Sequence, residues 1–312
     1  MFLRHLINPK PSTIIFFVFF CIIFACIPLF QYDINSIYQN TKVNSFLLLI
    51  ISIVLPFLIS MGLNNMIYEK NILKKENLLI SFIFILISCA FTNNIKVWTT
   101  TFLLLFLFNN LLKSYQKELP FSQFYNASLI LAVISFIFPN AICLILLLII
   151  NGINYSNLNL RIGTTIILGF ITPYLFYFIF SFLLNSSITM PDFFNFQNTE
   201  FSSINMWHHS KKIWIIILIC ISLLSFLELF TWLYKKSMKS RRTFMTIIWF
   251  FIICFITSLY STSEYFYFMF LPLSIILGNY FVYTKNRLIA NVLFLLLVIS
   301  SIYYKYMIGF NV

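Results

Sequence analysis

Residues 213–234 read IWIIILICISLLSFLELFTWLY, an apolar run interrupted by a single charge, Glu228. A helix that crosses a bilayer needs about 17 to 25 mainly apolar residues, because each residue rises about 1.5 Å through a hydrocarbon core about 30 Å thick. The run therefore predicts a transmembrane helix. Comparable runs lie at 13–30, 45–62, 78–92, 98–112, 124–138, 140–153, 164–185, 243–261, 264–284 and 288–307. We expect an all-α bundle of about eleven transmembrane spans.

The composition of the chain agrees with a membrane protein. Hydrophobic residues make up 61% of the 312 residues and charged residues only 9%, which is too little polar surface to cover a soluble globule. No soluble domain or internal repeat interrupts the runs, so we expect one integral membrane domain over residues 1–312. All six cysteines lie inside apolar runs without disulfide or metal-ligand spacing, so we expect free thiols, no metal and no cofactor.

The distribution of Lys and Arg predicts the orientation. If the N-terminus is cytoplasmic and the spans alternate, fifteen of the 20 Lys and Arg residues fall in inner segments. The other five fall outside: Lys42, Lys96, Lys211, Lys212 and Lys305. The positive-inside rule therefore favours a cytoplasmic N-terminus and an outer C-terminus in a bacterial inner membrane. The same rule explains the net charge of +12 without a nucleic-acid partner.

Two neighbouring runs, 124–138 and 140–153, are short and are separated by almost no loop. They predict either a tight outer hairpin of two full spans or a re-entrant pair that does not cross. We count them as two spans.

Two segments on the predicted outer face are long enough to carry a site, residues 31–44 and 186–212. We expect the second to lie on the membrane surface and to cover an outer cavity. Sugar transfer needs at least a carboxylate that takes a proton from an acceptor hydroxyl, opposite groups that hold a lipid phosphate. Asp33 is the candidate base, and the candidate substrate-binding residues are His208, His209, Lys211 and Lys212. The alternative is a turn residue at Asp33 and a headgroup anchor beside Trp207 and Trp214.

Two acidic residues fall within predicted spans, where charges are costly and therefore mark candidate sites. Glu228 shares a helical stripe with Ser225 and Lys235, which fits a proton or ligand site. The alternative is a glutamate near the cytoplasmic interface that is hydrogen-bonded to a neighbouring helix or paired with Lys235. Glu264 opens its run after hydroxyl residues, which fits either a helix cap or a catalytic carboxylate in an outward-facing pocket.

The chain resembles a group of uncharacterised multi-pass inner-membrane proteins of Bacteroidota. The likeness rests on its length, on an Asn-rich stretch from Asn64-Asn65 to Asn77, and on the late segment SEYFYFMFLPLSIILGNYF at 263–281. That late segment and the Phe138-Pro139-Asn140 turn also resemble the GT-C superfamily of polyprenyl-phosphate-sugar glycosyltransferases. The superfamily resemblance implies an acidic base in the first outer loop, where Asp33 is the sole acid. That loop covers only residues 31–44, whereas it is usually long in the superfamily.

Three functions remain open at this stage. The first is a GT-C-like glycosyltransferase of envelope glycan or glycolipid assembly, which would bind membrane lipids and a polyprenyl-phosphate-linked sugar. The second is a non-enzymatic subunit or assembly factor with an envelope protein as partner, and crosslinking in native membranes separates it from the first. The third is a transporter or flippase coupled through Glu228, which the scattered glycines disfavour because such proteins commonly show repeat symmetry.

Overall fold

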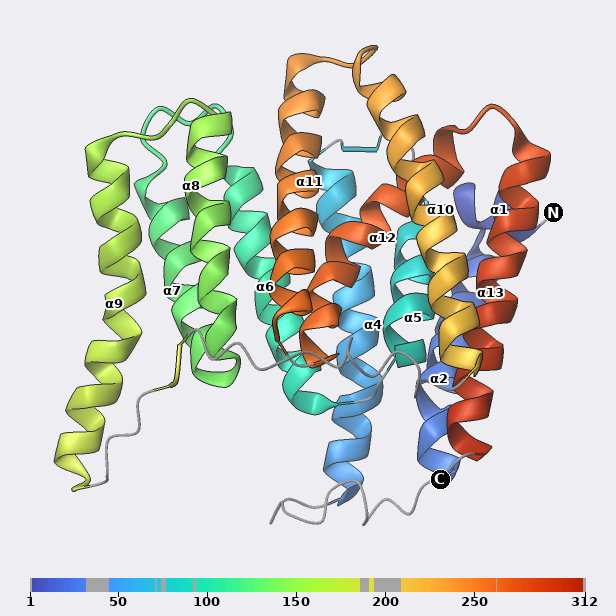
Figure 1. Ribbon diagram of the computed structural model, residues 1–312, viewed down its shortest axis with the longest axis horizontal. Helices are drawn as coiled ribbons and strands as arrows, with labels where there is room; N and C mark the ends of the chain where they lie inside the picture. Colours follow the sequence, from blue (N-terminus) through green and yellow to red (C-terminus); the bar gives the residue numbers. More distant parts are fainter. Residues whose placement is uncertain are drawn as a thin grey trace. The chain divides into compact units, whose positions relative to one another are not determined.

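A computed structural model describes residues 2–31, 45–70, 72–73, 77–91, 94–185, 191–193, 209–261 and 263–310. This part of the chain is helical and contains no strand, which confirms the all-α prediction (Figure 1). The elements are α1 (Phe2–Ile7), α2 (Pro11–Gln31), α4 (Ser45–Glu69), α5 (Leu79–Phe91), α6 (Ile95–Lys113), α7 (Phe121–Ile137), η1 (Pro139–Leu144), α8 (Ile145–Asn154), α9 (Leu160–Leu183), α10 (His209–Leu233), α11 (Met238–Leu259), η3 (Ser263–Tyr265), α12 (Phe266–Tyr283) and α13 (Arg287–Phe310).

Each predicted apolar run coincides with helical structure. Among the described residues, seven helices are long and apolar enough to cross a membrane: α4, α6, α9, α10, α11, α12 and α13. The other four runs form shorter apolar helices at Pro11–Phe24, Leu79–Ala90, Phe121–Ile137 and Pro139–Asn154. A helical membrane protein is therefore the class that the fold supports.

The chain divides into two compact units. Unit 1 comprises Met1–Thr99, Ser203–Lys236 and Phe270–Val312, and unit 2 comprises Thr100–Ser202 and Ser237–Met269. Each unit is described by itself below.

In unit 1, α10 and α13 pack side by side in opposite directions. Near the start of α10, the Trp214 indole N–H donates to the Ser301 hydroxyl over 3.1 Å, and its ring stacks on Tyr304 near the end of α13. A cluster of phenylalanines joins α2, α5 and α13, with Phe82 of α5 4.7 Å from the Phe20 ring and 5.9 Å from the Phe294 ring. Large aromatic rings bury much apolar area, so these contacts organise the unit.

In unit 2, α7 and α9 pack closely, as Figure 1 shows. Gly169 of α9 allows this approach, because a Cβ atom there would lie only 2.7 Å from the Tyr125 carbonyl oxygen of α7. Hydroxyl pairs reinforce the contact, and the Tyr125 and Thr172 oxygens lie 3.1 Å apart. The rest of α9 is mostly exposed apolar surface, because only 17% of its apolar stretch is buried. In a membrane that surface faces lipid or another protein.

Hydrogen bonds from two asparagines of α8 to its neighbours hold one end of unit 2 together. The Asn151 side chain is fully buried on α8, and its amide donates to the Leu111 carbonyl and the Ser114 hydroxyl while accepting from Thr246 of α11. Asn154 donates to the Arg242 carbonyl over 2.7 Å. These bonds satisfy buried polar groups and tie α8 to α6 and α11, so their role is structural.

Candidate functional site

The opposite end of α8 is held by a second polar cluster, which we call the Asn140 junction: Asn140, Ser261 and Tyr265. The Asn140 backbone N–H donates to the Tyr265 hydroxyl over 3.1 Å, and its side-chain amide donates to the Ser261 hydroxyl over 2.8 Å. Phe138 packs edge-on against the Tyr265 ring, with centroids 5.2 Å apart. The Phe138-Pro139-Asn140 turn is thus fastened to the segment that connects α11 to α12.

Glu264 lies in this connecting segment, in the 3-10 helix η3 that packs against the end of α11. Its side chain is partly exposed, and its negative charge acts on the neighbouring Tyr265 phenol. Burial, with smaller contributions from Cys143 and Glu264, raises the pKa of Tyr265 to about 12, so the phenol stays protonated at neutral pH. The Ser261 hydroxyl accepts from the Asn140 side chain.

An apolar groove runs along α11 toward this segment, and we call it the α11 groove. It has a volume of about 370 Å³ and is lined by Cys143, Leu146, Ile253, Ile256, Thr257 and Tyr260. The Thr257 hydroxyl donates to the Cys254 carbonyl within its own helix over 2.9 Å, which satisfies its donor. The groove therefore suits a hydrocarbon chain, and its last lining residue, Tyr260, directly precedes the Asn140 junction in the sequence.

The structure places the polar neighbours of Glu228 in the residues that follow α12. Thr284 lies within hydrogen-bonding reach of its carboxylate, and the cation whose charge acts on it is Lys285, not Lys235 on its own helix. The Trp232 and Tyr283 rings pack beside each other, with the Lys236 ammonium 4.6 Å from the Trp232 centroid.

The outer-loop candidates are only partly described. Asp33 and His208 lie outside the described residues, as does most of segment 186–212. His209 is the exposed first residue of α10, and Lys211 and Lys212 lie in its first turn, partly buried. These residues belong to unit 1, whereas Glu264 belongs to unit 2. Among the described residues, no group of three His, Cys, Asp or Glu side chains could hold a metal ion.

One of the residues counted among the outer cations is buried between helices. Lys305 was counted among the outer cations, yet it is 95% buried inside unit 1, and its exposed fraction is 5%. Its ammonium donates to the Phe24 carbonyl of α2 and lies 4.3 Å from the Phe24 ring centroid. A charge within the run 288–307 was the available signal, because ionisable groups inside spans usually have a specific partner.

These features define a helical membrane protein with an apolar groove on α11. Its sequence matches the model of a family of unknown function, DUF6427, over residues 9–311. The chain therefore belongs to that family. Neither the curated proteins nor the solved structures contain a match.

Proposed function

We propose that this chain is a multi-pass protein of the bacterial inner membrane, with eleven spans, a cytoplasmic N-terminus and an outer C-terminus. The positions of Lys and Arg support the orientation. The weakest point of the count is the segment Pro139–Asn154, which a re-entrant loop would also explain.

The pairing of this segment with α11 supports a full crossing. Asn140 bonds Ser261 just beyond one end of α11, and Asn154 bonds Arg242 near the other end. Residues 242–261 cover about 28 Å at the rise of an α-helix. Residues 140–154 reach about 23 Å because the 3-10 turns of η1 rise about 2 Å per residue. The length of residues 242–261 approaches the hydrocarbon thickness of about 30 Å, and residues 140–154 are about 7 Å shorter.

Cysteine labelling tests this topology. In a cysteine-free background, Asp192→Cys should react with a membrane-impermeant maleimide in intact spheroplasts, whereas Ser240→Cys should react only after lysis. Asp192 is exposed in the predicted outer loop, and Ser240 lies in the basic first turn of α11. Labelling of Ser240→Cys in intact spheroplasts would overturn the orientation.

The function that the site supports best is transfer of a sugar from a polyprenyl-phosphate carrier on the outer leaflet, as in GT-C-like enzymes. The observation that carries this proposal is the α11 groove, which is apolar and is lined by Tyr260, four residues before Glu264 in the chain. The groove would hold part of the polyprenyl chain. That placement would leave the phosphate and sugar near η3, at the level of the outer headgroups.

In this proposal Glu264 acts as the general base. Its carboxylate takes the proton of the acceptor hydroxyl as that oxygen bonds to the sugar carbon, and the polyprenyl phosphate leaves with the electrons of the broken bond. Tyr265 keeps its proton and holds Asn140, which fixes the position of η3. Tyr265 is thus a positioning residue. Asp33 remains the alternative base.

Glu264→Gln should lower sugar transfer about 100-fold or more, because a general base contributes that much and the amide keeps the shape but cannot accept a proton. The measurement is transfer of radiolabel from a polyprenyl-phosphate-linked hexose to lipid and glycan in membranes that contain the full chain. Glu118→Gln, an exposed acid between α6 and α7, is the matched control. Parent-like transfer by Glu264→Gln together with loss in Asp33→Asn would assign the base to Asp33 instead.

A groove-filling variant separates binding from chemistry in the same assay. Ile256→Trp should raise the KM for the lipid-linked donor because the indole occupies the space of the chain, with kcat little changed. Ile167→Trp, also on an exposed apolar surface, controls for the added bulk. An unchanged KM in Ile256→Trp would remove the groove from the proposal.

A further inference from the structure

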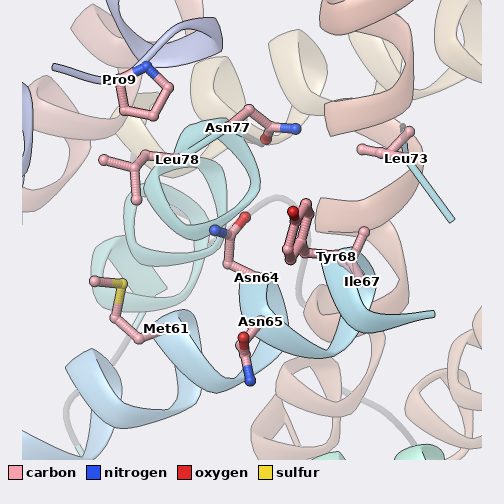
Figure 2. Close-up of a pocket in the computed structure, with 9 residues that line it drawn as sticks. All are labelled: Pro9, Met61, Asn64, Asn65, Ile67, Tyr68, Leu73, Asn77 and Leu78. Carbon is pink, nitrogen blue, oxygen red and sulfur yellow. The ribbon is translucent and has the colours of Figure 1, made fainter. Parts of the chain in front are cut away.

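A second pocket lies in unit 1, and none of its lining residues has been assigned a role above. It has a volume of about 360 Å³ and is lined by Pro9, Met61, Asn64, Asn65, Ile67, Tyr68, Leu73, Asn77 and Leu78. We call it the Asn64 pocket. Its walls come from the end of α4, the residues that lead into α5, and Pro9 between α1 and α2 (Figure 2). By the topology proposed above, these segments meet at the cytoplasmic face.

The pocket is unusual because amides line it at the end of strongly apolar helices. Figure 2 shows Asn64, Asn77 and Tyr68 around the same opening, with Met61 and Leu78 on its apolar side. Asn65 donates to the Glu69 carboxylate over 2.9 Å, which occupies one amide proton. Asn64 makes no hydrogen bond within the described part of the chain, although its amide offers two protons and an acceptor oxygen.

The chemistry of the lining side chains indicates which class of ligand the pocket binds. Amides and a phenol both donate and accept, so they match neighbouring hydroxyl groups, as in glycerol or a sugar. Among its described lining residues there is no carboxylate, which disfavours a divalent cation. The apolar side fits the carbon skeleton of such a ligand. At this volume the pocket takes one headgroup-sized molecule, at the small end of ligand sites.

Basic residues near the pocket indicate that its ligand also carries a phosphate. Lys10 directly follows Pro9, and Lys70 follows Tyr68 by two residues, so cations flank two of the pocket walls. Glu69, the acid beside Lys70, is engaged by Asn65. Basic residues at the cytoplasmic ends of transmembrane helices attract anionic headgroups.

We infer that the Asn64 pocket binds a hydroxylated phosphate group, a glycerol phosphate or sugar phosphate. The group belongs either to an inner-leaflet lipid or to a soluble metabolite. The inference does not depend on the transferase proposal, because the two sites share no residue.

Binding to the purified full-length protein in detergent tests the inference with three probes: short-chain phosphatidylglycerol, glucose 1-phosphate and short-chain phosphatidylcholine. Phosphatidylglycerol or glucose 1-phosphate should bind at least 10-fold more tightly than phosphatidylcholine, and Asn64→Leu should weaken that binding about 10-fold or more. Preference for the lipid identifies a headgroup ligand, and preference for the sugar phosphate identifies a soluble one.

Two variants guard against trivial results. Asn110→Leu on α6 replaces an amide outside the pocket and should bind as the parent does. Tyr68→Phe removes one hydroxyl and should weaken binding several-fold even if Asn64→Leu accumulates poorly. Equal binding of all three probes, binding of none, or parent-like affinity in both pocket variants would overturn the inference.

Discussion

Replacing Lys305 with methionine should lower the free energy of unfolding by about 2 kcal/mol, although the change removes a buried charge. The Phe24 carbonyl needs a donor because Pro28, four residues later in α2, has no N–H to complete the helical hydrogen bond. The Lys305 ammonium supplies that donor and also lies over the Phe24 ring. In a membrane, a carbonyl freed by proline must be satisfied by a neighbouring helix.

The size of the effect follows from two opposing contributions. An unsatisfied buried carbonyl costs about 1–3 kcal/mol, and the lost cation–π contact adds about 1 kcal/mol. Removal of a buried ammonium returns part of this, because a desolvated charge is itself unfavourable. Methionine fills nearly the same volume, so no large cavity adds to the loss.

A double-mutant cycle identifies the cause. Pro28→Ala restores the N–H to α2, so Lys305→Met should cost little or nothing in that background. The free energies are measured by reversible unfolding in mixed detergent and SDS micelles, with both single variants and the double variant. Strictly additive losses would show that Lys305 does not serve the carbonyl that Pro28 leaves free.

Lys305 also shows why part of the structure could not be predicted from the sequence. Hydropathy finds the helix that carries it, and the observed α13 covers the predicted run 288–307. The residue was nevertheless read as an outer cation, because its acceptor lies 281 residues away in the sequence. Periodicity along one helix carries no information about a carbonyl on another.

The cation near Glu228 could not be predicted from the sequence for the same reason. Its stripe on one helix pointed to Lys235, whereas the interacting cation, Lys285, follows α12. Side chains that share a helical face are predictable from spacing, and partners across helices are not. Asn140 was recognised as part of a turn, but its bonds to Ser261 and Tyr265 likewise span more than 120 residues.

Two glycines of α9 should respond to alanine in opposite directions. Gly163→Ala should raise the free energy of unfolding by up to about 1 kcal/mol, because alanine favours the helix and no atom lies within 4 Å of its added Cβ. Gly169→Ala should lower it by about 1–3 kcal/mol, the usual cost of overpacking. The same mixed-micelle unfolding measurement compares the two.

The loss at Gly169 exceeds the gain in helix propensity because its neighbour cannot give way. The obstructing Tyr125 oxygen is a backbone atom, and the Ser128 hydroxyl that also meets the new Cβ is held by a hydrogen bond to that oxygen over 2.9 Å. Moving α9 outward would lengthen the 3.1 Å contact between Tyr125 and Thr172 and the 2.6 Å contact between Ser135 and Tyr174. Equal stabilisation by both substitutions would mean that α7 and α9 do not pack through Gly169 in the membrane.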